Sequence, residues 1–196
     1  MDLKQALAYT EDIISGVTAT EASMLYDLAV EVHSQGLGSV VEVGAYTGKS
    51  TIILSAAGPV YSIDHHRGNA EHQPGQARCR SGTLIEERVD TFPIFKTNLS
   101  RAGLWSQTTA IVTDHITALQ LLPSKAIPIA LLFADADHSE FGTWLLIECW
   151  RNKVRGVMAF HDYCEDFPGV VAAVDRANFG PPLFKVDSLI GFRVGK

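Results

Sequence analysis

The chain has 196 residues, 46% of them hydrophobic and 19% charged, which is enough for one well-buried domain and short for two. Its formal net charge of −6, with the basic residues scattered, excludes a broad electrostatic surface for nucleic acid or anionic membrane. No apolar run reaches the roughly 20 residues of a membrane span, and the amino terminus lacks the apolar core of a secretory signal. The three cysteines, Cys79, Cys149 and Cys164, form no CxxC pair, which suits a reducing compartment. We therefore expect a cytoplasmic protein with no nucleic-acid or membrane partner, folded as a single domain over residues 1–196.

Helix-like and strand-like segments alternate along the chain, which is the pattern of a mostly parallel sheet covered by helices on both faces. The first clear helix is predicted to follow a capping box of Thr18 and Glu21 and to end at Gly36. Other helices are predicted over 49–58 and 90–104, and strands over 38–44, 60–64, 108–114, 127–135 and 156–162. The sequence therefore predicts an α/β, doubly wound fold.

Two segments depart from this alternation. The final run, 181–195, has two strand-like stretches too close together for a crossover helix, so they must pair as a hairpin. Residues 65–91 are polar and rich in Gly and His, which predicts a long irregular loop just past a strand end. A loop of this length is more often functional or mobile than structural.

All five predicted strands end in acidic or histidine residues. These ends carry Glu42 to Gly48, Asp64 with His65 and His66, Asp114 with His115, Asp135 to His138, and His161 with Asp162. In a doubly wound sheet the ligand site lies beyond the carboxyl ends of the strands, so these residues are candidates for one shared site. The alternative for each single aspartate is that it caps the following helix.

The glycine turn "EVGAYTGKST" resembles a phosphate-binding P-loop at its end but not at its beginning. Gly44 and Gly48 enclose three residues instead of four, and Val43 stands where the first P-loop glycine belongs. The dinucleotide pattern fails as well, because Tyr46 occupies the place of its second glycine. The hydrophobic run "IALLFAD" imitates a Walker B strand, so a P-loop nucleotide-binding protein is kept as a rival hypothesis.

S-adenosylmethionine fits this glycine turn better than a phosphate does. Its ammonium needs an acceptor, for which Glu42 is the candidate, and its carboxylate needs donors such as Ser50 and the amides of the helix start. Asp64 ends the second strand where an acid that binds ribose hydroxyls is expected. Lys49 then has no phosphate to meet and is expected to be a solvated residue of the first helical turn.

The string "VVEVGAYTGKST" resembles the first motif of class I S-adenosylmethionine-dependent methyltransferases, in particular the small O-methyltransferases of the catechol and caffeoyl-CoA type. "VYSIDHHRG", "FADADHSEFG" and "VRGVMAFHDY" are similar to later landmarks of the related bacterial branch that methylates macrolide sugars. The resemblance implies a seven-stranded sheet of order 3-2-1-4-5-7-6 whose last strand is antiparallel. It also implies a small-molecule acceptor, while a homodimer is the commonest assembly for such a protein.

Carried over onto this sequence, the resemblance implies a set of residues that border the cofactor. They are Glu42, Gly44, Tyr46, Gly48, Ser50, Asp64, His65 and Asp114. Asp114 falls where the family contacts the adenine, although it could equally serve only as a cap. The triplet Val154-Arg155-Gly156 replaces the family's Pro-Gly-Gly before the fifth strand, a departure that affects a turn and not the chemistry.

Methyl transfer to a hydroxyl is an in-line displacement in which the acceptor must be aligned and deprotonated. The resemblance implies that Asp135 and Asp162 bind a divalent cation such as Mg²⁺, which would orient the acceptor and lower its pKa. It also places His138 as the general base, so His138 and Asp135 are the predicted catalytic residues. The family's asparagine ligand is replaced by Tyr163.

Three alternatives stay open for the metal. His161, Asp137 or a residue of the 65–91 loop could complete the shell, and His161 is our candidate. The histidines of that loop could instead form a zinc site with Cys79, although their spacing matches no known pattern. An enzyme without a metal, and a non-catalytic module that only binds S-adenosylmethionine, are the remaining alternatives.

Overall fold

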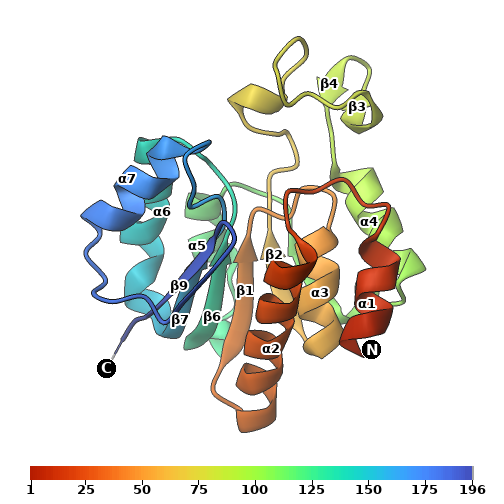
Figure 1. Cartoon of the computed structure of the whole chain (residues 1–196). Coiled ribbons are helices and arrows are strands. Elements are labelled where there is room, and N and C mark those ends of the chain that lie inside the picture. Colours follow the sequence, from red (N-terminus) through yellow and green to blue (C-terminus); the bar gives the residue numbers. More distant parts are fainter. Residues whose placement is uncertain (196) are drawn as a thin grey trace.

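The computed structural model describes residues 1–195, which form a seven-stranded sheet of order β5-β2-β1-β6-β7-β9-β8 (Figure 1). Its strands are β1 (Ser39–Val43), β2 (Val60–Ile63), β5 (Thr108–Ile111), β6 (Ile129–Ala134), β7 (Val154–Phe160), β8 (Phe184–Val186) and β9 (Leu189–Arg193). The first five of these pair in parallel, and β9 runs antiparallel to both β7 and β8. The predicted strand order, the antiparallel last strand and the final hairpin are therefore confirmed.

Helices cover both faces of the sheet (Figure 1). One face packs against α1 (Leu3–Thr10), α2 (Ala19–Gln35), α3 (Lys49–Ala57) and α4 (Phe92–Arg101), and the other against α5 (His115–Leu121), α6 (Glu140–Trp150) and α7 (Pro168–Arg176). The predicted capping box of α2 is present, because Thr18 accepts from the Glu21 N–H and the Glu21 carboxylate accepts from the Thr18 N–H. Among the described residues, no helix is long and apolar enough to cross a membrane.

The segment 65–91 is more ordered than the predicted irregular loop. It contains short 3₁₀ turns at Ala70–His72 and Ser81–Thr83 and a small antiparallel ribbon of β3 (Leu84–Ile85) and β4 (Arg88–Val89). Figure 1 shows it standing above the carboxyl edge of the sheet. A polar loop without hydrophobic periodicity gives no sequence signal for such short elements, so the prediction missed them.

Glu42 lies inside the fold and not at the rim of the sheet. Alternation along β1 directs Val41 and Val43 into the core beneath α5 to α7, and Glu42 therefore points to the opposite face. Its side chain is fully buried, and its Oε2 accepts from Thr51 Oγ1 at 2.5 Å and from Ser62 Oγ at 2.7 Å. Burial raises its pKa to about 7, against the opposing effect of these hydrogen bonds. Glu42 thus ties α3 and β2 to β1.

The turn after β1 requires glycine at position 44. Gly44 has a φ of 98°, and a Cβ added there would overlap the backbone carbonyl of Asp135. The replacement Gly44→Ala should therefore lower the free energy of unfolding by about 3 kcal/mol. Gly82→Ala is the matched control, because an added Cβ at Gly82 meets no atom within 4 Å and its φ is ordinary. Urea denaturation of both variants measures their free energies of unfolding. Equal values would contradict the close approach of Gly44 to the Asp135 carbonyl.

The buried carboxyl of Glu42 should make stability depend on pH. Its pKa is about 7 in the folded state against an ordinary value of 4.5, so between these values the folded state keeps a proton that the unfolded state has released. The contribution of Glu42 to the free energy of unfolding should thus fall by about 3 kcal/mol as pH rises through this window. Glu42→Gln cannot titrate. Urea denaturation at pH 4.5 and pH 8 should show that the free energy of unfolding of the variant rises relative to that of wild type at the higher pH. The same difference in free energy at both pH values would contradict the burial of an ionisable Glu42.

Candidate active site

A cavity of about 430 Å³ opens at the carboxyl edge of the sheet, beneath the 65–91 segment. Most of the predicted site residues line it, namely Gly44, Tyr46, Asp64, His65, Asp114, Asp135, His138, His161 and Asp162. Glu42, Gly48 and Ser50 are buried behind this surface and do not line it. Lys49 is half-buried and does not line it either.

The glycine turn wraps around the carboxylate of Asp64. Asp64 Oδ2 accepts from the backbone N–H groups of Ala45 at 2.8 Å and Tyr46 at 2.7 Å, and its Oδ1 accepts from the N–H of His66 at 2.6 Å. A carboxylate has about four acceptor positions, so Asp64 keeps capacity for a further donor from the cavity. Asp64 therefore shapes the turn as well as facing the cavity.

Asp114 caps α5, as the alternative for this residue anticipated. Its Oδ1 accepts from the N–H groups of Ile116 at 3.0 Å and Thr117 at 2.9 Å. The hydrogen bonds from Thr117 hold the pKa of Asp114 below its usual range. Asp114 also lines the cavity, so the cap does not exclude contact with a ligand.

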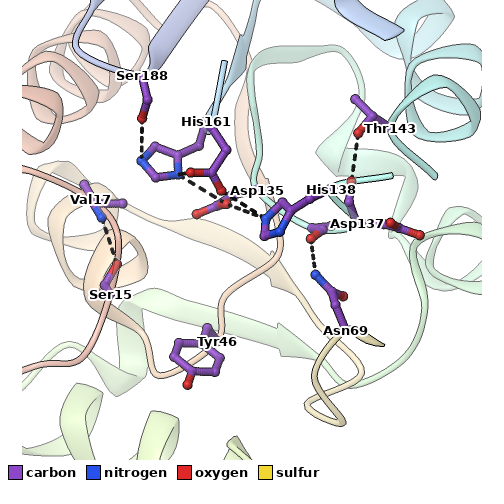
Figure 2. Close-up of polar contacts among 12 residues, drawn as sticks. Ser15, Val17, Tyr46, Asn69, Asp135, Asp137, His138, Thr143, His161 and Ser188 are labelled. Atoms are coloured by element: carbon purple, nitrogen blue, oxygen red, sulfur yellow. Dashed lines mark hydrogen bonds and ion pairs between the residues drawn. The ribbon is translucent and has the colours of Figure 1, made fainter. Parts of the chain in front are cut away.

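Three metal-binding side chains converge at the ends of β6 and β7. Asp135 follows β6, while His161 and Asp162 follow β7, and the parallel register that pairs Ala134 with Phe160 brings the next residues together. His161 Nδ1 lies 3.4 Å from Asp135 Oδ1, a residue that lies beside it in Figure 2. The same nitrogen lies 3.3 Å from Asp162 Oδ1. One donor atom from each of the three side chains lies within 4.8 Å of the other two.

The converging nitrogen has the features of a metal ligand. His161 Nδ1 is buried and makes no hydrogen bond of acceptable geometry, although both carboxylates are near. The residues present therefore fit a divalent cation. Within residues 1–195 no other group of histidine, cysteine and acidic side chains has this spacing, and Cys79 belongs to no such group.

The charges of this cluster depend on one another. Burial disfavours a charged His161, but the nearby Asp135 and Asp162 outweigh burial and raise its pKa well above the usual range. Burial likewise opposes ionisation of Asp135, while the charge of His161 and the nearness of His138 hold its pKa far below normal. The two carboxylates thus require a positive charge between them.

Glu21 is a functional neighbour that sequence reasoning missed. The sequence pattern assigns it only to the capping box of α2, yet its Oε2 lies 3.1 Å from His161 Nε2. Its Oε1 accepts from the backbone N–H of Ser188 at 2.8 Å and from Ser188 Oγ at 2.7 Å. Burial opposes its ionisation, but the hydrogen bonds to His161, Thr18 and Ser188 lower its pKa to about 2. No local sequence signal links position 21 to position 161.

His138 lies on the other side of Asp135 from His161 (Figure 2). Its Nε2 lies 3.0 Å from Asp162 Oδ2 and 3.7 Å from Asp135 Oδ1. Its Nδ1 lies 2.6 Å from Oε1 of Glu71, a residue of the 65–91 segment. Burial would lower the pKa of His138, but the nearby carboxylates of Asp135 and Asp162 raise it to about 10. Glu71 gave no sequence signal, because it is one acid in a polar segment.

Comparison with known proteins identifies the family. Residues 41–163 match the family described as a methyltransferase domain. The solved structure of the O-methyltransferase NovP has a TM-score of 0.70 and 16% sequence identity, covering 93% of this chain and 82% of that chain. An O-methyltransferase from Bacillus cereus, solved in complex with SAH, has a TM-score of 0.62 and 18% identity over 99% of this chain and 90% of that one.

A third structure extends the same likeness. TomG from Streptomyces achromogenes, an O-methyltransferase involved in tomaymycin synthesis and solved in complex with SAM, has a TM-score of 0.58 and 16% identity. The match covers 98% of this chain and 89% of that chain. At these identities the likeness shows a shared fold. Because the family match spans more than half of the chain and the sheet has the order expected of the class I fold, the chain belongs to the methyltransferase domain family.

Proposed function

We propose that this protein is an S-adenosylmethionine-dependent O-methyltransferase that acts on a hydroxyl of a small molecule with the help of a divalent cation. The observation that carries the proposal is the meeting of Asp135, His161 and Asp162 in the cavity that the glycine turn also borders. A cofactor at the turn and an acceptor at the cation would thus share one enclosure. We take residues 1–196 as one domain, and a homodimer and a cytoplasmic location stay predictions.

The cofactor half of the cavity supports S-adenosylmethionine. Its size lies within the range of about 300–1,000 Å³ that is usual for small-molecule sites. Asp64 offers acceptor positions for ribose hydroxyls, and Tyr46 borders the same region, where its ring stacks on His72 at 5.2 Å. Since Glu42 and Ser50 are buried, their contribution is to support the turn rather than to contact the ligand. Two structural relatives were solved in complex with SAH and with SAM, which supports this class of cofactor.

The acceptor half would place a hydroxyl against the cation ligands. A divalent cation held by Asp135, Asp162 and His161 would supply Lewis acidity, which lowers the pKa of a hydroxyl and orients it. Held through these three side chains, the acceptor hydroxyl would be aligned for in-line displacement. Phe167, whose ring lies edge-on to His138 at 4.6 Å, supplies an apolar wall to this part of the cavity.

His138 is proposed as the general base, with Glu71 orienting it. Because Glu71 accepts a hydrogen bond from Nδ1–H, a neutral His138 carries its proton there, and the lone pair of its Nε2 faces Asp162 and Asp135. A pKa of about 10 would keep the ring protonated and unable to act as a base. That shift arises from Asp135 and Asp162, so the base role depends on a cation that neutralises these two carboxylates. The proposed base role of His138 therefore requires the proposed cation.

Two alternatives from other classes have separate consequences. A P-loop nucleotide-binding protein would use Lys49, which does not line the cavity, and the family match also disfavours it. A non-catalytic module would bind S-adenosylmethionine but would have no use for His138 or Asp135.

Calorimetric titration tests the cofactor. S-adenosylmethionine and S-adenosylhomocysteine should bind, ATP should not, and Asp64→Ala should weaken binding by about 10- to 100-fold, because a charge-assisted hydrogen bond and the shape of the turn are both lost. Lys49→Ala is the control and should bind within about two-fold of wild type. Absence of binding by either adenosyl compound would sink the proposal, whereas ATP binding lost in Lys49→Ala would establish the P-loop rival.

Turnover separates an enzyme from a binding module. With S-adenosylmethionine and a panel of hydroxylated sugars and phenolics, formation of S-adenosylhomocysteine should fall by at least about 100-fold in His138→Ala, since a general base is lost. Cofactor affinity should stay near wild type in this variant. Glu71→Gln should show a smaller loss, because it leaves the imidazole in place but weakens its orientation. Equal turnover in His138→Ala and wild type would contradict the base assignment.

A further inference from the structure

We infer that the cation site takes a transition-metal dication in preference to Mg²⁺, and that Glu21 is the positioning residue that creates this preference by fixing the ring of His161. The inference rests on the cation site proposed above and goes beyond it, because it names the class of metal and assigns a residue outside the cavity. Glu21 does not line the cavity.

The donor set itself distinguishes between metals. Mg²⁺ prefers oxygen ligands and water, whereas imidazole nitrogen suits first-row transition metals and zinc. Here two carboxylates, Asp135 and Asp162, meet one imidazole, that of His161. A site of three oxygens would serve Mg²⁺, so the nitrogen is the feature that needs an explanation.

The ring of His161 is fixed so that Nδ1, and not Nε2, faces the carboxylates. Its Nε2 lies 3.1 Å from Glu21 Oε2, and its side chain is 2% exposed. An ionised carboxylate can only accept hydrogen bonds, so Nε2 carries the proton and a neutral ring has its lone pair on Nδ1. This arrangement of carboxylate, histidine and metal position is the one that sets tautomer and basicity in metal sites.

Glu21 is itself held rigidly. Its side chain is fully buried, and beyond His161 its oxygens accept from the N–H of Thr18 at 2.8 Å, from the N–H of Ser188 at 2.8 Å and from Ser188 Oγ at 2.7 Å. These partners lie at the start of α2 and in the β8–β9 turn. A ring that is held from behind by so firmly fixed a carboxylate cannot rotate to present a different atom.

The distances fit a shared ion better than an internal ion pair. A histidine that served only as a positive charge among three carboxylates would aim an N–H at one oxygen, but Nδ1 makes no hydrogen bond of acceptable geometry. It is nearly equidistant from Asp135 Oδ1 at 3.4 Å and Asp162 Oδ1 at 3.3 Å. Two donors bonded at about 2.1 Å to one ion lie roughly 3.0 to 3.4 Å apart for octahedral to tetrahedral angles.

The test titrates CoCl₂ and MgCl₂, each by calorimetry, into protein from which metal has been removed with a chelator. The readout is the ratio of the two dissociation constants, which is independent of any acceptor. Wild type should bind Co²⁺ at least about 100-fold more tightly than Mg²⁺. His161→Asp replaces the nitrogen by an oxygen, and Glu21→Gln weakens the hydrogen bond behind it. Each should reduce this ratio at least about ten-fold, and the visible absorption of bound Co²⁺ should shift in both.

The control variant Thr18→Ala distinguishes the positioning role of Glu21 from a purely structural role in the capping box. This variant removes the other half of the same capping box and should lower the thermal unfolding midpoint, but it leaves the contact of Glu21 with His161 in place. Its Co²⁺ to Mg²⁺ ratio should equal that of wild type. If Glu21→Gln fails to fold, Ser188→Ala removes the hydroxyl that contacts both Glu21 Oε1 at 2.7 Å and His161 Nε2 at 3.3 Å, and it should reduce the ratio about three-fold.

Different failures have different meanings. Equal affinities for the two ions in wild type, or a ratio unchanged in His161→Asp, would overturn the metal preference and leave the cation site standing. Equal loss in Thr18→Ala and Glu21→Gln would overturn the positioning role. Binding of neither ion would overturn this inference together with the proposed cation, while binding of S-adenosylmethionine would still be judged by its own titration.

Discussion

The site depends on one electrostatic constraint: two carboxylates, Asp135 and Asp162, are brought together in a poorly solvated place and cannot both stay ionised there without positive charge nearby. Two parallel strands that end side by side create the problem. Two histidines, His138 and His161, flank the two carboxylates and supply part of the positive charge that they need. Each histidine is in turn held from behind by a further acid, so the cluster as a whole still lacks positive charge. A divalent cation would resolve this imbalance.

The acids behind the histidines connect the site to distant parts of the chain. Glu21 joins the start of α2 and the β8–β9 turn to His161, and Glu71 joins the 65–91 segment to His138. The same segment reaches the site a second time through Arg78, whose guanidinium lies 4.2 Å above the ring of Phe167. The segment that covers the cavity (Figure 1) therefore also sets the ring of the proposed base. The 65–91 segment therefore covers the cavity and also contacts the proposed base through Glu71.

Sequence patterns alone predicted the α/β class and placed the candidate site residues at strand ends. Alternating elements, the helix caps and the short final hairpin predicted a sheet covered on both faces, while the family resemblance supplied its strand order and the pairing of Asp135 with Asp162. The rule that ligands bind beyond the carboxyl ends of strands predicted one shared site for the strand-end residues. The rule fails for Glu42, because alternation within β1 turns its side chain into the core one residue before the strand ends. A position near a strand end therefore does not establish that the side chain points toward the ligand site.

The partners of the histidines could not be predicted for a different reason. Glu21 lies 140 positions from His161, and its capping box already explained its presence locally. Glu71 belongs to a segment whose polar composition has no period from which a direction could be inferred. Contacts of this kind depend on tertiary packing, and a single sequence carries no record of them.

Anomalous diffraction from crystals grown with CoCl₂ and S-adenosylhomocysteine tests the central claim most directly. The account predicts one anomalous peak in the cavity, bonded to Asp135, Asp162 and His161 Nδ1, with the cofactor against the glycine turn and Asp64. A cofactor-bound structure whose carboxylates show no peak, or whose only peak lies at the histidines of the 65–91 segment, would contradict it.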